Sequence, residues 1–271
     1  MVRKIKTAFQ RLLLLVVVQL CAALVNAQFY QGTNMEFGKN RVQYREFTWF
    51  YYPSENFEVY YYVGGEDLAQ YTLMACERNL KEMQQFFDFT IDEKIEVISY
   101  LNQSEFRQSN LGLTGDDQYN IGGAAKIVGS KMFTYYEGDH LLLERQIREN
   151  LARVLFAQLV YGGNWKDVLK NSTLLSIPKW FEEGIIAFAA EGVSSESVTF
   201  VKDLVRANRF KSFNQFEGDD ARLAGQTFWN FIAEVYGQNV IPNILYMVQA
   251  SRNVESGFLY VLGLSLDQLS Q

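Results

Sequence analysis

The chain of 271 residues has one histidine, two cysteines and three prolines, and these scarcities exclude several kinds of chemistry. Because His140 is alone, a zinc site that uses two or three imidazoles cannot form within the chain. A cysteine–histidine nucleophile pair would need His140 itself as its base. Acid–base catalysis near pH 7 usually depends on histidine, so catalysis here would have to use carboxylates, tyrosine or lysine.

Long apolar runs are also scarce, and the clearest one lies near the N-terminus. Four Lys and Arg residues within 3–11 precede an apolar run at 12–25, and small residues follow at 25–27. This order is typical of a secretory signal peptide, and the run is shorter than the roughly 20 residues that span a bilayer. We predict a signal peptide at 1–27, no membrane span after its cleavage, and export to the periplasm or the cell surface.

The charge balance restricts the partners of the exported chain. Cleavage would remove four of the 25 basic residues and no acidic ones, so the net charge would change from −6 to −10. An acidic chain repels nucleic acid and anionic lipid, and we exclude both as partners. Cys21 would also be removed, which leaves Cys76 in an apolar helical stretch as a predicted buried thiol.

The hydrophobic pattern changes near Asp139, from a sheet-rich part at 40–137 to a helical part at 139–271. We predict a single domain at 28–271 of the α+β class, with Asp139 as a helix N-cap. The predicted strands are at 46–63 (two strands joined at 53–56), 95–101 and 126–136. The predicted helices are at 66–89, 140–161, 178–190, 195–208, 221–236, 239–250 and 254–262. A further short helix is predicted to begin with Ser104 as its N-cap.

Two helical segments in the second part carry a specific motif. The first is Arg148-Glu149-Asn150-Leu151-Ala152-Arg153-Val154, and the second is Trp180-Phe181-Glu182-Glu183-Gly184. Together they resemble the peptidase MA-like gluzincins, in which one helix carries His-Glu-x-x-His and the next carries Trp-Phe-x-Glu-Gly. From about Asn40 onward the chain resembles more closely the N-terminal domain of bacterial exported proteins in which a β-propeller follows. The resemblance implies a zincin-like fold and a β-propeller domain or subunit as a partner.

The chain departs from the family pattern at the positions that carry the chemistry. Glu149 stands at the first histidine position, Asn150 at the general base and Arg153 at the second histidine. Only Glu183 keeps the ligand type that the resemblance implies. Asparagine cannot accept a proton, and arginine has no lone pair for a metal. We therefore expect no metal, no cofactor and no catalytic residue at these four vestigial positions.

The replacement residues also predict an ion-pair cluster of Glu149, Arg153 and Glu183. A glutamate four residues before an arginine has the favourable orientation on a helix, and Glu183 would approach from the next helix. If the cluster is internal, it places a fixed cation where the family has its metal. The alternative is an ordinary exposed pair within one helix, worth about 0.3–0.5 kcal/mol.

The resulting functional hypothesis is a catalytically inactive, metallopeptidase-like domain that acts in protein or peptide binding or as a scaffold. Its former cleft could bind an extended chain by strand addition to a sheet edge. One alternative is an active peptidase or glycan hydrolase that uses a site without histidine, such as paired carboxylates around Glu182 and Glu183. Another is a purely structural cap. His140 is expected to be a surface or capping residue, and the paired tyrosines at 51–52, 60–62 and 135–136 to be core or a stacking surface.

Overall fold

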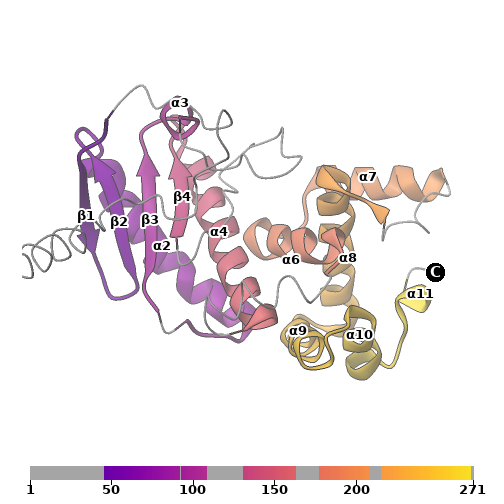
Figure 1. Cartoon of the computed structure of the whole chain (residues 1–271). Helices are drawn as coiled ribbons and strands as arrows, with labels where there is room; N and C mark the ends of the chain where they lie inside the picture. The colour runs from indigo at the N-terminus through magenta and orange to yellow at the C-terminus, as the bar shows by residue number, and fades with distance from the viewer. Residues whose placement is uncertain (1–45, 92, 109–130, 163–176, 208–214, 270–271) are drawn as a thin grey trace, which may run out of the picture. The chain divides into compact units, whose positions relative to one another are not determined.

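A computed structural model describes residues 46–91, 93–108, 131–162, 177–207 and 215–269 (Figure 1). The contacts of the chain divide it into Met1–Asn40 and Arg41–Gln271, and every described residue belongs to the second unit. The predicted signal peptide at 1–27 therefore lies outside the described residues, as does the predicted start of the domain at 28.

A four-stranded mixed sheet forms the N-terminal part of the described chain (Figure 1). Its order is β1 (Trp49–Pro53), β2 (Phe57–Tyr62), β3 (Ile95–Tyr100) and β4 (Lys131–Tyr135). β1 is antiparallel to β2, whereas β2, β3 and β4 are parallel to one another. α2 (Glu66–Phe87) connects β2 to β3, and the short α3 (Gln103–Phe106) follows β3.

Alternation along the strands gives the sheet two different apolar faces. One face packs on α2 and α4 (His140–Tyr161) and includes Phe57, Val97 and Met132. The opposite face is aromatic: Tyr62, Tyr100 and Tyr135 align across three strands, and Phe106 of α3 packs against them. Both faces are buried along β3, which explains its nearly continuous apolar sequence.

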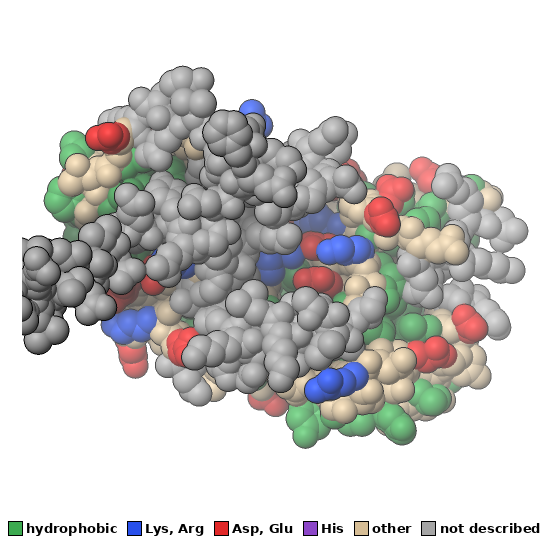
Figure 2. Space-filling view, viewed as in Figure 1, with side chains coloured by type: hydrophobic (Ala, Val, Ile, Leu, Met, Phe, Trp, Pro, Cys, Tyr) green, Lys and Arg blue, Asp and Glu red, His purple; other side chains and the backbone are tan. Residues whose placement is uncertain are grey.

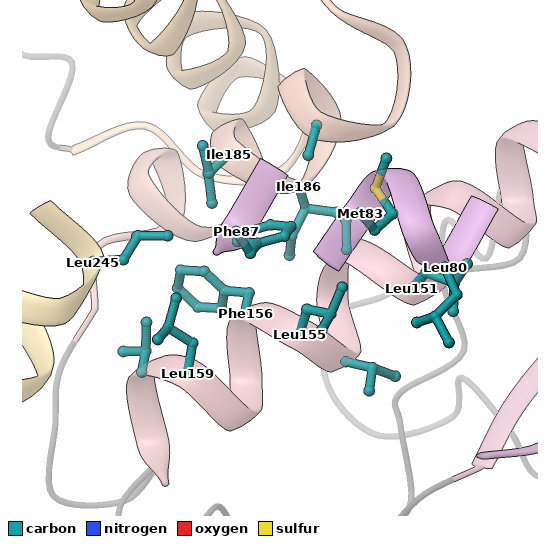
Figure 3. Close-up of a cluster of buried hydrophobic side chains, with 14 of the residues drawn as sticks. Leu80, Met83, Phe87, Leu151, Leu155, Phe156, Leu159, Ile185, Ile186 and Leu245 are labelled. Carbon is teal, nitrogen blue, oxygen red and sulfur yellow. The ribbon is translucent and has the colours of Figure 1, made fainter. Parts of the chain in front are cut away.

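The remaining described helices continue from α4 to the C-terminal part of the chain. They are α6 (Lys179–Glu191), α7 (Ser195–Arg206), α8 (Gly218–Tyr236), α9 (Val240–Ser251), α10 (Val254–Leu262) and α11 (Leu266–Leu269). α4 is buried on several sides, and side chains of α2, α4, α6 and α9 converge in one core around Phe87, Phe156 and Leu245 (Figure 3). A helix with apolar side chains on more than one face belongs in the middle of a domain, and α4 lies there.

Two glycines allow α6 and α8 to approach closely. A methyl group at Gly225 of α8 would lie 1.9 Å from the carbonyl oxygen of Trp180, and one at Gly184 would lie 2.4 Å from the Gly225 Cα. Real side-chain carbons do not approach backbone atoms so closely, so any larger residue would force the helices apart. The glycine that follows Glu183 in the sequence motif therefore serves helix packing.

The α+β class is confirmed, and most predicted elements form within one to three residues of their predicted bounds. Asp139 caps α4 by accepting a hydrogen bond from the Leu141 N–H at 2.7 Å, and Cys76 is buried. The predicted cap of α3 is wrong: Asn102, not Ser104, is the N-cap. Asn102 has an extended backbone, and its Oδ1 accepts a hydrogen bond from the Glu105 N–H in the first turn of α3. Part of the strand region predicted at 126–136 lies outside the described residues.

Along the described chain, no helix combines the length and the apolar character that crossing a bilayer requires.

Candidate functional site

The sequence motif converges at a contact between α4 and α6. Both terminal nitrogens of Arg153 donate to the carboxylate of Glu183, with Nη1–Oε1 and Nη2–Oε2 distances of 2.9 and 2.8 Å. This two-pronged geometry is the strongest arrangement available to an arginine and a carboxylate. The side chains are only 17% and 26% exposed, so the pair is partly removed from water. Charged side chains of both signs lie next to one another over this region in Figure 2.

Local chemistry explains how the two groups meet. The extended backbone of Pro178 begins α6, and Glu183 follows one turn into the helix. Arg153 lies in the fourth turn of α4, on a helix in which many of the other residues are buried. Because both side chains are mostly buried, the guanidinium and the carboxylate have few solvent partners, which favours their direct pairing.

Electrostatics distinguish Glu183 from its neighbour Glu182. Burial by itself would raise the pKa of Glu183, but the charge and hydrogen bonds of Arg153 hold that pKa below its usual value. Burial, followed by the charge of Glu183, raises the pKa of Glu182 above its usual value. The pKa of Arg153 is raised against the effect of burial, chiefly by Glu183. At neutral pH the site is therefore a fixed ion pair beside a second, less favourable carboxylate.

Glu149 has a different partner from the one that its spacing predicts. Its carboxylate accepts a hydrogen bond from Nη2 of Arg222 on α8, at 2.7 Å. The same nitrogen lies 2.8 Å from Glu191 at the end of α6. The expected cluster of Glu149, Arg153 and Glu183 is thus divided into two ion-pair groups. The reason is tertiary: the close approach of α6 and α8 brings Arg222 to Glu149, while Glu183 engages both terminal nitrogens of Arg153.

Asn150 lies on another side of α4, against the sheet. Its Nδ2 donates to the Phe133 carbonyl at 3.0 Å, and Gln146, one turn earlier, accepts the Tyr135 N–H at 3.2 Å. The next amide, that of Tyr136, donates to Tyr100 of β3, so the Phe133 and Tyr135 groups point away from β3. Two side-chain amides of α4 therefore occupy the outer edge of β4. The Asn150 Oδ1 is buried without a hydrogen-bond partner.

The donor set at the four vestigial positions does not suit a zinc ion. Two of the four side chains are carboxylates, and each is already held by a guanidinium. Arginine offers a metal no lone pair, and the Asn150 amide nitrogen is used by Phe133. Among the described residues, no group of three or more His, Cys, Asp and Glu side chains is placed to hold a metal ion.

The other residues considered from sequence lie elsewhere. The His140 ring packs on Tyr71, with centroids 4.4 Å apart, and its Nδ1 lies 3.0 Å from the Tyr136 hydroxyl. The paired tyrosines differ in burial: Tyr62 is a core residue, whereas Tyr51 is 52% exposed at the edge of the sheet.

Sequence reasoning missed Arg222 and Gln146. Gln146 had a readable signal, a polar residue one turn from Asn150 on a mostly apolar helix. The sequence carries only a weak signal for Arg222, because its contact with Glu149 depends on where α8 crosses α6. Arg148, inside the motif, holds Asn79 of α2 and the Ala189 carbonyl of α6 at 2.8 and 3.4 Å. It links three helices rather than facing Glu183.

In comparison with known proteins, neither a family model nor a curated protein matches this chain.

Proposed function

We propose that the chain is a catalytically inactive, gluzincin-like domain that works by binding a protein or peptide or as a scaffold. The observation that carries the proposal is the Arg153–Glu183 pair. It joins the two helices that, by the sequence resemblance, would carry the zinc ligands. Arg153 supplies Glu183 with a permanent positive charge in place of a metal ion. The zincin-like fold, export and a β-propeller partner belong to the same proposal.

The surroundings of the pair support a structural rather than a catalytic role. A general base must be free to accept a proton, yet Asn150 has no basic group and donates to the Phe133 carbonyl. Glu149 is held by Arg222, and Glu183 by Arg153. A bidentate arginine keeps the pKa of its carboxylate low, so Glu183 is poorly suited to accept or donate a proton near pH 7.

The sharpest test rebuilds the motif. The triple variant Glu149→His, Asn150→Glu, Arg153→His restores His-Glu-x-x-His while Glu183 is kept. If the helices have the gluzincin arrangement, this variant should bind one zinc ion per chain in a metal-stoichiometry measurement. Adding Glu183→Gln should abolish tight binding.

Two controls accompany the rebuilt variant. Because Arg222 lies beside position 149, an Arg222→Gln version tests whether its charge alone prevents binding. The unaltered chain should bind no stoichiometric zinc and should not hydrolyse casein, peptides or glycans with or without chelator. A rebuilt variant that folds, as judged by circular dichroism, but takes up no zinc in either version would contradict the gluzincin arrangement. Hydrolysis by the unaltered chain would favour the alternative of an active hydrolase.

A further inference from the structure

The two edges of the described sheet differ in their availability to another strand. At the β4 edge, the Phe133 carbonyl and the Tyr135 N–H are already bound by Asn150 and Gln146. A peptide added there would have to displace both side-chain amides, one of which is almost fully buried. Strand addition at the sheet edge beside α4 is therefore disfavoured.

The β1 edge is open within the described part of the chain. β1 pairs with β2 on one side, and no described strand pairs with it on the other. Native proteins protect such an edge with charged side chains or proline, and in β1 the one proline, Pro53, lies at the end beside the β1–β2 turn. The five residues of β1, Trp-Phe-Tyr-Tyr-Pro, include no charge, and Phe50 and Tyr51 are 45% and 52% exposed. They project to opposite faces of the sheet, so both faces of the edge are apolar.

Ring contacts hold this edge in a defined shape. Tyr51 stacks on Tyr60, with ring centroids 5.3 Å apart, and Tyr52 stacks on Tyr61 at 4.7 Å. Cross-strand aromatic pairs stabilise an antiparallel ladder and fix its register. A strand that arrives at β1 therefore meets an ordered template, and less conformational entropy is lost on binding.

Charge around the β1–β2 turn indicates the chemistry of the occupant. Glu55 is exposed in the turn, and Glu58 lies opposite Pro53 in the β1–β2 register. Lys94 is the nearby cation, and its Nζ donates to the Ser54 carbonyl at 2.7 Å. Glu77 is hydrogen-bonded to Ser54 and Asn56 in the same turn. With three carboxylates against one ammonium, the end of the edge beside the turn favours a basic residue on the partner.

We propose that β1 is a strand-addition site for an extended segment of another protein, with alternating apolar side chains and a Lys or Arg at the end beside the β1–β2 turn. Hydrophobic and acidic side chains both reach the surface at the edge of the molecule where Figure 1 places β1 (Figure 2). A second copy of the chain is a poorer occupant, because two copies carry net negative charge of the same sign. The site lies on the opposite edge of the sheet from β4 and does not depend on the loss of zinc chemistry.

The test uses the full chain and a fluorescein-labelled probe peptide of five alternating Val and Thr residues followed by two Lys. Fluorescence anisotropy should show saturable binding. A peptide ending in two Glu should bind at least tenfold more weakly, and one with Pro at its central position should not bind, because it cannot continue the ladder. Hydrogen exchange should slow at the amides of 49–52 when the Lys peptide is bound, since Pro53 has no amide proton.

Matched variants locate the binding. Tyr51→Lys introduces the missing edge charge and should weaken binding at least tenfold, whereas Tyr260→Lys, at a tyrosine 68% exposed on α10, should have no effect. Phe50→Lys repeats the test from the other face of the strand if Tyr51→Lys unfolds. Unchanged binding by folded β1 variants, equal binding of the Lys and Glu peptides, or dimerisation through β1 in sedimentation experiments would overturn the proposal. The double variant Arg153→Met with Glu183→Met removes the ion pair with less expected loss of stability and should leave peptide affinity unchanged, which separates this site from the proposed pseudopeptidase role.

Discussion

Two sides of α4 bind polar groups of the neighbouring elements with different kinds of side chain. Toward the sheet, Gln146 and Asn150 use neutral amides to bind backbone groups of β4. Toward α6 and α8, Arg153 and Glu149 use full charges to bind side chains of opposite sign. A backbone partner is neutral and fixed in place, so an amide satisfies it without the cost of burying a charge. A charged partner on another helix requires a countercharge, and the energetic consequences of removal are correspondingly larger.

Removal of Arg153 should give the largest effect. Arg153→Ala leaves the Glu183 carboxylate partly buried without its partner, next to Glu182. We expect a loss of about 3 kcal/mol in the free energy of unfolding, near the lower end for buried pairs because Arg153 is 17% exposed. Urea denaturation monitored by circular dichroism measures it.

The double variant Arg153→Met with Glu183→Met is the matched control for this pair. It removes both charges, so most of the lost stability should return. If Arg153→Ala is as stable as the unaltered chain, the pair is not an internal bridge, and the charged side of α4 contributes no more than an exposed ion pair.

Removal of Asn150 should give a smaller loss. Asn150→Ala leaves the Phe133 carbonyl of β4 without its side-chain donor, at an expected cost of about 1–2 kcal/mol. Gln146→Ala should act similarly and should speed hydrogen exchange specifically at the Tyr135 amide, measured by NMR. If Asn150→Ala or Gln146→Ala lowers the free energy of unfolding as much as Arg153→Ala does, the two sides of α4 do not differ as proposed.

Glu182 and Glu183 of α6 should contribute to the free energy of unfolding with opposite dependence on pH. The pKa of Glu183 is lowered on folding, so its contribution to stability is present above its unfolded pKa near 4.5 and is lost as the pH falls through the folded value. The pKa of Glu182 is raised, so its ionised form opposes folding at neutral pH. Glu182→Gln should therefore raise Tm by about 1–2 °C at pH 7 and have little effect below pH 4.5.

Thermal unfolding of the two single variants between pH 3.5 and 7 measures this contrast. Glu183→Gln should lower Tm at pH 7, and the difference from the unaltered chain should narrow as the pH falls. The same sign of effect for both substitutions at pH 7 would contradict the assignment of Glu182 as the unfavourable carboxylate.

Much of the fold was predictable from local pattern. The 3.6-residue spacing in 140–161 and the Asp139 cap predicted the bounds of α4, and alternation predicted β1 and β2 on either side of a turn at 53–56. These signals are local, because hydrophobic periodicity and capping act within one or two turns. The cap of α3 was mispredicted by two residues, since Asn102 and Ser104 both have suitable side chains and only the backbone conformation selects between them.

The partners of the site residues were less predictable. Helical spacing alone favoured a Glu149–Arg153 pair, but the structure gives Glu149 to Arg222, 73 residues further along the chain. That choice depends on the contact between Gly184 and Gly225, which brings α8 against α6. The sequence also did not predict that one side of α4 binds the edge of β4 while another binds α6 and α8. Sequence alone does not reveal which side of a buried helix meets a strand edge.

The sequence by itself determined that a zinc site with two or more imidazoles cannot form within this chain, since it has one histidine. It also determined the order of sheet and helices, because periodicity is a property of neighbouring residues. Only the tertiary structure decided that Arg153 binds Glu183 with both nitrogens, that Asn150 closes the β4 edge, and that β1 is left open among the described strands. These are contacts between distant segments, and their geometry is set by helix crossing and sheet order rather than by local preference.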